Sequence, residues 1–418
     1  MTKQNFLKQL IKTKKAGVEL AASSLKTRNA ALREIAGQLR QAKGLILKEN
    51  RKDVRKFKTE DPLRDRLLLT EERIAAMIND IQTVIKLPDH LNVILEEKTI
   101  ENGLSVRKVS SAFGVVGVIY ESRPNVTVDV AVLNLKVGNA VVLKGGDDAC
   151  FSNRILVELM REALRKAGLA QETILHIDPR DKDLIGFMLK RRDLIDLIIP
   201  RGGHGLIKFV RENSEIPVIE TGAGVCHTFV DDSADMEMAG NIVYNAKVSR
   251  PSVCNSLDTL LVHKKAALSL LKNLDARLRE KGVEIYADEK SFAILKARAY
   301  PYLKRAKKHD YGREFLSLKM AIRVVEGIDE AIRHIGTYST KHSEAIVTGN
   351  NRNADKFLNS VDAACVYHNA STRFTDGSQF GLGGEIGIST QKLHARGPMS
   401  VKELTTYKWI IKGRGQTR

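Results

Sequence analysis

The fold of this chain is decided by the stretch FGVVGVIY, which spans Phe113–Tyr120. It is a short apolar run with two glycines, a composition typical of a strand that is buried on both faces and lies close to its neighbours. A helix is expected from Asn125 to Lys136, and a second apolar strand covers Asn139–Gly146. Strand, helix and strand in this order predict a unit with two parallel strands.

The alternation of strand and helix continues along most of the chain. We expect helices at 151–167, 181–190 and 203–213, and strands at 173–177, 194–199 and 216–220. After Gly224 the cycle restarts, with strands at 226–230 and 257–262, helices at 234–247 and 264–280, and further strands near 320–326, 344–348 and 364–367. Strict alternation implies right-handed crossovers, so the sequence predicts two α/β domains with mostly parallel sheets.

The segments that flank these blocks follow other patterns. Residues 1 to about 88 predict three helices, with Thr70 as the cap of the third. Two short strands, Val93–Glu97 and Leu104–Lys108, flank an Asn-Gly pair that is typical of hairpin turns, because both of its positions tolerate positive φ. Thr405–Lys412 predicts a final strand.

Composition limits the classes of function. A chain of 418 residues exceeds one ordinary core, so two or three domains are expected. The excess of 68 Lys+Arg over 50 Asp+Glu gives a net charge of +18, which raises the hypothesis of nucleic-acid binding. The basic residues are scattered, however, and form neither a zinc-finger spacing nor a basic region that leads into heptads. A general attraction for anionic small molecules is the favoured interpretation.

The cysteines and the apolar segments indicate the compartment. Four cysteines, at positions 150, 226, 254 and 365, form no CxxC pair. The first 20 residues lack the continuous apolar region of a signal peptide, and no run of about 18 apolar residues occurs, so we expect no membrane span. These features predict reduced thiols in a cytoplasmic protein. The histidines show no ligand spacing, so no metal site is expected.

The stretch KVSRPSVCN, residues Lys247–Asn255, holds the candidate nucleophile, Cys254. Arg250 stands four residues before it, and a fixed positive charge favours the thiolate, which is the reactive form of cysteine. Most cysteines are small buried apolar residues, and these nine residues alone leave that alternative open.

Two further segments are expected at the carboxyl ends of strands, where parallel sheets bind ligands. They are Lys144 with the glycines that follow it, and the run PRGGHG at Pro200–Gly205. The glycines would let backbone amides and a helix N-terminus face a phosphate group. A plain glycine turn between strand and helix is an equally good interpretation of the second run.

Several long motifs occur in a fixed order along the chain. They are FGVVGVIYESRPN at 113–125, RPSVCN at 250–255, NASTRFTDG at 369–377, STQKLHARGPM at 389–399 and LTTYKW at 404–409. In these motifs the sequence resembles the gamma-glutamyl phosphate reductases, a family within the aldehyde dehydrogenase superfamily. The resemblance extends from about residue 10 to 412.

The resemblance implies an aldehyde dehydrogenase-like α/β fold. Its expected parts are a Rossmann-type NADP-binding domain (1–92 and 111–223), an α/β catalytic domain (224–399) and a small β oligomerisation element (93–110 and 400–418). In that element the hairpin would pair with the C-terminal strand and complete a sheet with a neighbouring subunit, which covers an exposed edge.

The activity implied is that of a glutamate-5-semialdehyde dehydrogenase. Such an enzyme uses NADPH to reduce L-glutamyl 5-phosphate to L-glutamate 5-semialdehyde and phosphate through a cysteine thioester, the second step of proline synthesis from glutamate. The implied partners are further copies of the chain, as a dimer or a dimer of dimers, and functional association with glutamate 5-kinase. No nucleic-acid or membrane partner is expected. The residues leave the choice between NADPH and NADH open.

Catalytic roles follow from positions in the motifs. Cys254 matches the nucleophile of the superfamily, and Asn125 with the backbone N–H of Cys254 are the candidate donors to the oxyanion. Glu220 lies 34 residues before Cys254, where hydrolytic members of the superfamily keep a general base. Because reduction of an acyl phosphate has no water attack to catalyse, we expect Glu220 mainly to line the pocket.

Binding roles follow in the same way. Lys144 matches the lysine that meets the adenosine ribose or its phosphate, Arg201 and Gly202 match the loop beside the pyrophosphate, and Glu314 matches a glutamate that binds the nicotinamide ribose. We expect Arg123 and Arg250 to hold the leaving phosphate, with ordinary salt bridges as the alternative. The candidates for the α-carboxylate and α-amino group of the substrate are Thr372, Arg373, Asp376 and Ser378.

One segment departs from the family pattern. Where a Tyr-Gly-Ser-Gly-His type of segment is expected, this chain has YSTKH at Tyr338–His342, so two glycines are missing and a lysine is added. Two alternatives to the implied activity also stay open. One is a related thiol-dependent reductase that acts on another activated acid, such as an acyl-CoA, and the other is a basic nucleic-acid-binding protein with steeply salt-dependent affinity.

Overall fold

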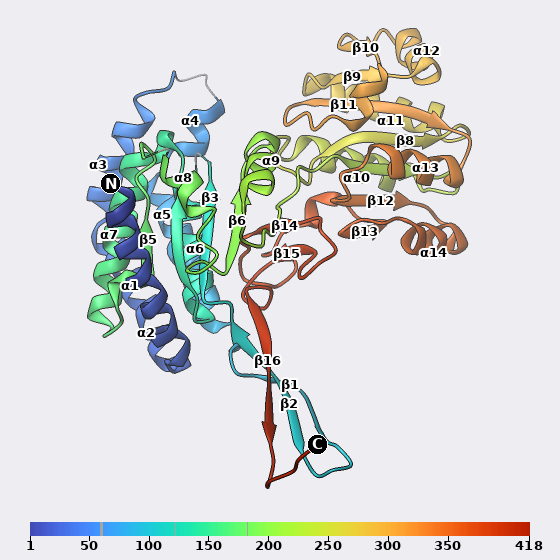
Figure 1. The fold of residues 1–418 in the computed structure, drawn as a ribbon. Helices are drawn as coiled ribbons and strands as arrows, with labels where there is room; N and C mark the ends of the chain where they lie inside the picture. The colour runs from blue at the N-terminus through green and yellow to red at the C-terminus, as the bar shows by residue number, and fades with distance from the viewer. Residues whose placement is uncertain (59–61, 122, 182) are drawn as a thin grey trace. The chain divides into compact units, whose positions relative to one another are not determined.

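The computed structural model describes residues 1–58, 62–121, 123–181 and 183–418. The chain forms two compact units (Figure 1). The first unit comprises Met1–Thr221, Gly381–Gly387 and Pro398–Arg418, and the second comprises Gly222–Phe380 and Ile388–Gly397. The predicted catalytic domain, 224–399, includes residues 381–387 and 398–399. In the structure, hydrogen bonds hold these two segments in the first unit. The Ile386 N–H donates to Met399 O (2.8 Å), and the Arg201 guanidinium donates to Ile386 O.

The first unit is built on a four-stranded parallel sheet of order β5-β4-β3-β6. The strands are β3 (Val115–Tyr120), β4 (Ala140–Lys144), β5 (Ile174–His176) and β6 (Leu197–Arg201). Strand β3 is buried along its whole length and pairs on both sides, so the stretch that begins the alternation forms the centre of the sheet. A Cβ at Gly117 would lie 2.5 Å from Ile198 Cδ1, which is why this position of β3 carries a glycine.

Helices cover both faces of this sheet. The first unit contains α1 (Lys3–Ala22), α2 (Leu25–Gln41), α3 (Lys43–Val54), α4 (Pro62–Leu67), α5 (Glu71–Lys86), α6 (Pro124–Lys136), α7 (Cys150–Lys166), α8 (Asp183–Met188) and α9 (His204–Asn213). Helices α6 and α7 pack on one face, with α2, α3 and α5 outside them. On the other face, Phe6 and Leu10 of α1 and Leu184 of α8 share a core with alternate strand residues.

The second unit contains a seven-stranded, entirely parallel sheet of order β10-β9-β11-β8-β7-β12-β13. Its strands are β7 (Cys226–Val230), β8 (Leu257–His263), β9 (Glu284–Ala287), β10 (Leu303–Arg305), β11 (Lys319–Val325), β12 (Ser343–Val347) and β13 (Cys365–His368). One core lies under α10 (Met236–Val248), α11 (Ala267–Glu280) and α12 (Glu289–Ala297), and a second under α13 (Ile328–Tyr338) and α14 (Asn351–Ser360). The remaining short strands are β14 (Gly387–Ser389) and β15 (Gly397–Met399).

The predicted alternation is confirmed, with three differences. The described part of residues 1–88 contains five helices instead of three, because Ser24 caps a new helix by accepting from the Thr27 N–H (3.1 Å) and further breaks follow. Residues 216–220 form no strand and make one parallel bridge, Ile198↔Val218, since Pro217 has no N–H to donate. Strands β9, β10, β14 and β15 were not predicted; each has only three or four residues.

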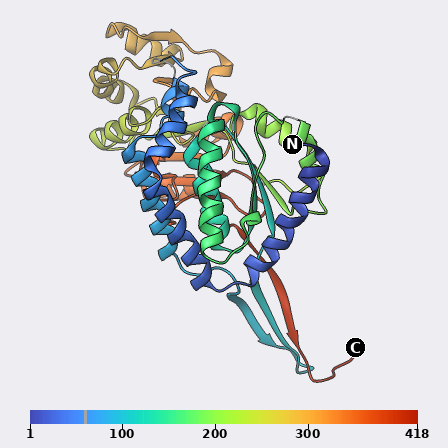
Figure 2. The same ribbon diagram turned by 90° about the vertical axis from the view of Figure 1, so that its left-hand side faces the viewer.

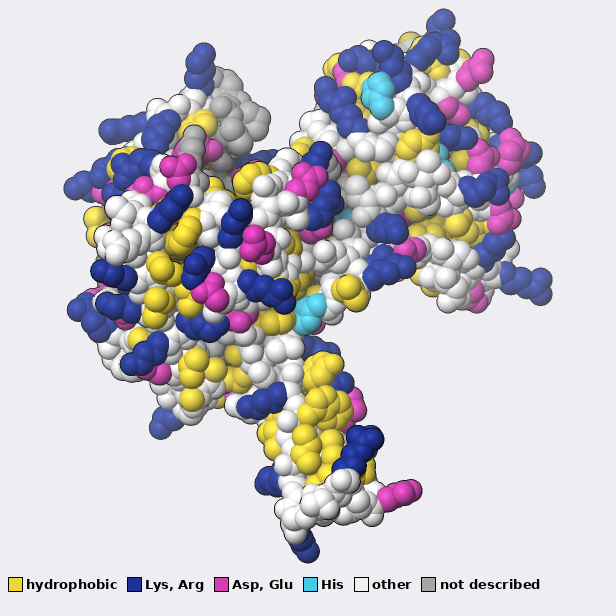
Figure 3. Space-filling view, in the orientation of Figure 1, with side chains coloured by type: hydrophobic (Ala, Val, Ile, Leu, Met, Phe, Trp, Pro, Cys, Tyr) yellow, Lys and Arg dark blue, Asp and Glu magenta, His cyan; other side chains and the backbone are white. Residues whose placement is uncertain are grey.

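A three-stranded antiparallel sheet, here called the arm, projects from the body of the first unit in both ribbon views (Figures 1 and 2). It consists of β1 (Ile94–Thr99), β2 (Ser105–Ala112) and β16 (Thr405–Lys412) in the order β1-β2-β16. The predicted pairing of the hairpin with the C-terminal strand is therefore present. Figure 3 shows apolar side chains gathered on the arm, and every residue of β1 is exposed.

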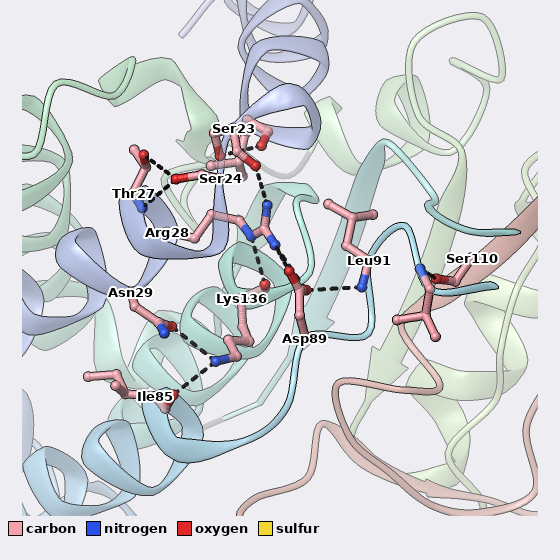
Figure 4. A network of polar contacts seen from close by, with 12 residues as sticks. Ser23, Ser24, Thr27, Arg28, Asn29, Ile85, Asp89, Leu91, Ser110 and Lys136 are labelled. Atoms are coloured by element: carbon pink, nitrogen blue, oxygen red, sulfur yellow. Dashed lines mark hydrogen bonds and ion pairs between the residues drawn. The ribbon is translucent and has the colours of Figure 1, made fainter. Parts of the chain in front are cut away.

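A buried arginine ties the helices of the first unit to the base of the arm (Figure 4). The Arg28 side chain is 1% exposed, and its guanidinium donates to both carboxylate oxygens of Asp89 (2.9 and 2.8 Å), to Lys136 O (3.0 Å) and to Ser23 O (2.5 Å). Lys136 Nζ donates to Asn29 Oδ1 and Ile85 O, both at 3.0 Å. Burial lowers the pKa of Lys136, whereas the Asp89 carboxylate opposes that shift.

No helix among the described residues is long and apolar enough to cross a bilayer.

The Arg28 network gives a first prediction. Replacement of Arg28 by Ala leaves Asp89 and two carbonyl oxygens without their donors, so we expect a loss of about 3 kcal/mol in the free energy of unfolding, measured by urea denaturation. Arg33→Ala, an exposed arginine on the same helix, is the matched control and should change it by less than about 0.5 kcal/mol. Equal small effects of the two substitutions would contradict a structural role for the network.

Candidate active site

The predicted cofactor residues of the first unit lie at the carboxyl end of its sheet. Lys144 ends β4 and Arg201 ends β6. The strand register pairs Ile119 with Lys144 and Tyr120 with Arg201, so the two basic residues flank the end of β3 at nearly the same level. This end of a parallel sheet is where nucleotide cofactors bind, and two cations there suit its phosphates.

The glycines after β6 have an unexpected neighbour. A Cβ at Gly202 would lie 2.5 Å from the carboxylate carbon of Glu121, and the Gly203 N–H donates to Glu121 Oε2 (3.0 Å). The first turn of α9 therefore already holds a carboxylate where the sequence suggested a phosphate. Sequence reasoning could not find this contact, because it joins two loops 82 residues apart.

The remaining predicted residues of the first unit are Asn125, Arg123 and Glu220. Asn125 lies in the first turn of α6 and is half-buried, and its Nδ2 donates to Asp129 Oδ2 (3.0 Å). Burial raises the pKa of Asp129 to about 7. Arg123 precedes α6 in extended conformation. Glu220 forms an ion pair with Arg211 (3.5 Å).

Cys254 belongs to the second unit and lies in the turn between α10 and β8. It is partly exposed, whereas the other three cysteines are buried and all four are free thiols. The Ser256 N–H donates to Val253 O (3.0 Å), which closes the turn. Cys254 is therefore not a buried apolar residue, which was the alternative that its local sequence left open.

Two neighbours of Cys254 were missed by the sequence reasoning. A Cβ at Gly224 would overlap the carbonyl oxygen of Cys254, so only glycine fits there. Two residues later, Cys226 Sγ donates to the same oxygen (3.2 Å). The Gly224 N–H donates to Glu314 Oε1 (3.0 Å), and the Val225 N–H to Thr340 Oγ1 (2.9 Å). Glu314, predicted to bind the nicotinamide ribose, therefore also fixes the strand beneath Cys254.

Arg373 lies beside the Cys254 turn. It belongs to a short 3-10 helix, Thr372–Phe374, and its guanidinium donates to Asn255 Oδ1 and to Ser249 Oγ (3.1 Å). Burial lowers the pKa of Arg373, the positive charge of Arg250 lowers it further, and Cys254 is among the groups that oppose this shift. The guanidinium groups of Arg250 and Arg373 thus act on each other, and two such groups favour an anionic ligand between them.

The structure corrects the prediction for Thr372. Its side chain is fully buried, and its hydroxyl donates to Asn255 O (2.8 Å), so it holds the turn and does not face a substrate. Asp376 and Ser378 lie in the loop that follows, where Asp376 Oδ1 accepts from the Ser378 N–H (2.9 Å) and from its hydroxyl (2.5 Å). Both groups therefore bond within their own loop.

The segment that departs from the family pattern keeps the conformation that glycine would favour. Lys341 has a φ of 65°, in the left-handed region, which costs a residue with a Cβ roughly 1 kcal/mol. Local contacts compensate: the Lys341 N–H donates to Ser339 Oγ (2.7 Å), and its ammonium pairs with Asp362 (3.1 Å). Ser339 in turn donates to Glu344, a fully buried carboxylate that also binds His227 Nδ1 (3.0 Å).

Comparison with known proteins decides the family. The aldehyde dehydrogenase family profile matches residues 1–292. The chain is 51% identical over 415 residues to the gamma-glutamyl phosphate reductase of Chlorobium luteolum, and the alignment covers 99% of this chain and 98% of that protein. It is 52% identical over 392 residues to the gamma-glutamyl phosphate reductase of Chlorobaculum parvum, with 93% of each chain covered. The crystal structure of gamma-glutamyl phosphate reductase from Thermotoga maritima superposes with a TM-score of 0.93 at 45% identity over 99% of both chains.

The chain belongs to the gamma-glutamyl phosphate reductases of the aldehyde dehydrogenase family. The predicted family and fold class are confirmed. Members of this family are oxidoreductases, so the chain is an enzyme, and its aldehyde dehydrogenase fold implies a nicotinamide cofactor.

The contact of Gly224 with Cys254 gives a second prediction. In Gly224→Ala the added methyl group must displace the Cys254 carbonyl, so we expect kcat to fall by about 100-fold or more, as misplacement of a reacting group by 1 Å can cause. Gly336→Ala, at a helical glycine of the same unit with open space around it, is the matched control and should keep full activity. Near-normal kcat for Gly224→Ala would show that the turn is not positioned by this contact.

Proposed function

We propose that this enzyme reduces L-glutamyl 5-phosphate to L-glutamate 5-semialdehyde and phosphate, with NADPH as the hydride donor and Cys254 as the nucleophile. The observation that carries the proposal is the Cys254 turn: the one partly exposed thiol among four, fixed by Gly224 and Cys226 and accompanied by Arg250 and Arg373. Two relatives that are 51 and 52% identical to this chain are named gamma-glutamyl phosphate reductase, after this reaction.

The proposed reaction begins at the Cys254 sulfur. The thiolate attacks the acyl carbon, the tetrahedral adduct expels phosphate, and a thioester remains on Cys254. NADPH, when bound, supplies a hydride to the thioester carbon. The resulting thiohemiacetal then breaks its C–S bond, which releases the aldehyde and returns the thiolate. Each tetrahedral stage carries negative charge on the former carbonyl oxygen, and donors must already point there.

We assign the donors to the oxyanion as Asn125 and the backbone N–H of Cys254. An asparagine side chain has two amide protons, and only one is needed for the bond to Asp129, so the second remains for this purpose. The Cys254 N–H is carried by a turn whose backbone is fixed by contacts, which satisfies the need for pre-organised donors. Glu220, paired with Arg211, is proposed as a wall of the pocket without a proton-transfer role.

The substrate carries a phosphate at one end and an α-carboxylate with an α-amino group at the other. We propose that Arg250 and Arg123 hold the phosphate, because a dianion needs charge-assisted bonds. Arg373 is proposed to bind the α-carboxylate, and Asp376, a half-buried carboxylate, the α-amino group, with Ser378 beside it. The buried Thr372 acts only through the turn that it holds.

The direct test is the reaction run backwards. Wild-type enzyme should reduce NADP in the presence of glutamate semialdehyde only when phosphate is added, and NAD should be a poorer acceptor. Cys254→Ala should lose this activity by at least about 10⁴-fold, since no other partly exposed thiol is available among the described residues. Activity without phosphate, or turnover of an acyl-CoA in its place, would favour the alternative reductase.

Lys144 is proposed to meet the 2′-phosphate of NADPH, with Arg201 and Gly202 beside the pyrophosphate and Glu314 at the nicotinamide ribose. Two cations at one end of the sheet fit the phosphates of the cofactor. The Glu121 carboxylate, which accepts from the Gly203 N–H, would have to move away for a phosphate to bind at that N–H. We predict that Lys144→Ala raises KM for NADPH by about 10-fold or more and leaves KM for the acyl substrate unchanged. An equal rise in both constants would argue against a cofactor role.

The arm is proposed to join two copies of the chain into a homodimer, the unit of either a dimer or a dimer of dimers. On β16, Tyr407, Trp409 and Ile411 alternate along one face, and each is about half exposed (52, 47 and 55%). Large exposed apolar side chains in a row mark an interaction surface, and β1 leaves a sheet edge for a partner strand.

Substitution on the arm tests this interface. We predict that Trp409→Ser combined with Ile411→Ser shifts the protein from dimer to monomer at micromolar concentration, measured by sedimentation velocity, because the apolar face is lost. Lys412→Ser, at the exposed end of the same strand, should leave the assembly unchanged. A doubly substituted protein with the wild-type mass in solution would place the interface elsewhere.

The cellular setting follows from the same chemistry. The four free thiols support a reducing, cytoplasmic compartment. An acyl phosphate hydrolyses readily and must be supplied by a kinase that phosphorylates a γ-carboxylate, so functional association with glutamate 5-kinase remains part of the proposal.

A further inference from the structure

A cavity of about 340 Å³ lies in the first unit between α3 and α4. Its volume is at the lower end of the range of small-molecule sites. None of the residues assigned above to the nucleophile, the substrate or the cofactor lines it. The proposed reaction therefore gives this cavity no role.

Three arginines line the cavity: Arg51, Arg55 and Arg64. No acidic residue is among the described residues that line it. Within the part of the chain that the structure describes, none of the three guanidinium groups has a hydrogen bond or an ion pair. By contrast, the nearby basic residues Lys43, Lys52 and Arg73 each pair with an acidic residue. Arg51 and Arg55 stand at the C-terminal end of α3, where the helix dipole tolerates positive charge. An anion would therefore be attracted by three guanidinium groups that line one cavity.

The other walls of the cavity are apolar. They are formed by side chains such as Val54, Phe57 and Leu68. Binding sites for small molecules combine such walls with a few polar groups that fix orientation. The ligand that fits both features carries an anionic group, for the planar guanidinium donors, and an aromatic or branched aliphatic body, for the apolar side chains.

The floor of the cavity is held in place by Asn50. Its Nδ2 donates to Leu67 O (2.8 Å) and Ser152 Oγ (3.0 Å), and its Oδ1 accepts from the Leu69 N–H (2.8 Å). This one buried side chain thus joins α3, the segment after α4 and the first turn of α7. Because all of its hydrogen bonds are made within the protein, the cavity is formed before any ligand arrives, which lowers the cost of binding.

We propose that the cavity between α3 and α4 is a binding site, separate from the active site, for a small organic anion with an aromatic or branched aliphatic body. The anionic group lies among Arg51, Arg55 and Arg64, and the body lies against Val54, Phe57 and Leu68.

The experiment titrates the enzyme with the fluorescent aromatic sulfonate anilinonaphthalene sulfonate. In wild-type protein a saturable site with one probe per chain is expected. The double variant Arg51→Ala/Arg64→Ala should weaken this site by about 10-fold or more, because two charge-assisted contacts are lost. Lys48→Ala combined with Lys43→Ala removes the same charge from α3 at positions that do not line the cavity, and it should leave the affinity unchanged.

A second variant separates the cavity from general electrostatics. Leu68→Trp fills the space without removing an arginine and should also abolish the site, while circular dichroism and NADPH-dependent activity confirm that both variants are folded. Wild-type probe affinity in both variants would overturn the proposal. Complete displacement of the probe by NADP, with a parallel loss of NADP affinity in Arg51→Ala/Arg64→Ala, would also overturn it, since the cavity would then belong to the cofactor site.

Discussion

The position of Cys254, the proposed nucleophile, rests on a steric constraint: its carbonyl oxygen occupies the space that any side chain at residue 224 would need. Around this contact the backbone is fixed by further hydrogen bonds. Cys226 donates to the same oxygen, and Glu314 and Thr340 accept from the two N–H groups of residues 224 and 225. A reactive thiol is thereby presented on a rigid turn, which is what pre-organisation of a nucleophile requires.

Positive charge is the second theme of the structure. Arg250 and Arg373 act on each other beside the Cys254 turn, and Lys144 and Arg201 end the two strands that flank β3. The cavity between α3 and α4 is lined by three arginines. The basic residues are scattered over the chain, but some of them stand at each place where an anion is proposed to bind. The expectation of anionic small-molecule ligands follows from this distribution and not from the total charge alone.

The sequence was sufficient for the two α/β units and for most of their strands and helices, and it singled out Cys254 as the candidate nucleophile. Runs such as Phe113–Tyr120 specify buried parallel strands strongly, because their period and composition exclude a solvated helix. The misses have local causes: Pro217 removes a donor from an otherwise strand-like segment, and β10 has three residues, too few for a pattern. The burial of Thr372 and the contact of Glu121 with Gly203 were not predictable, since they depend on which distant loops meet.

The central claim is that Cys254 carries the acyl group as a thioester. Mass spectrometry of the intact enzyme tests it most directly, after incubation with glutamate semialdehyde and NADP in the absence of phosphate, when the thioester has no phosphate to release it. The proposed mechanism predicts a mass increase of one glutamyl group, located at Cys254 after proteolysis and lost on addition of phosphate. An unmodified Cys254 under these conditions, or a glutamyl group on another residue, would contradict it.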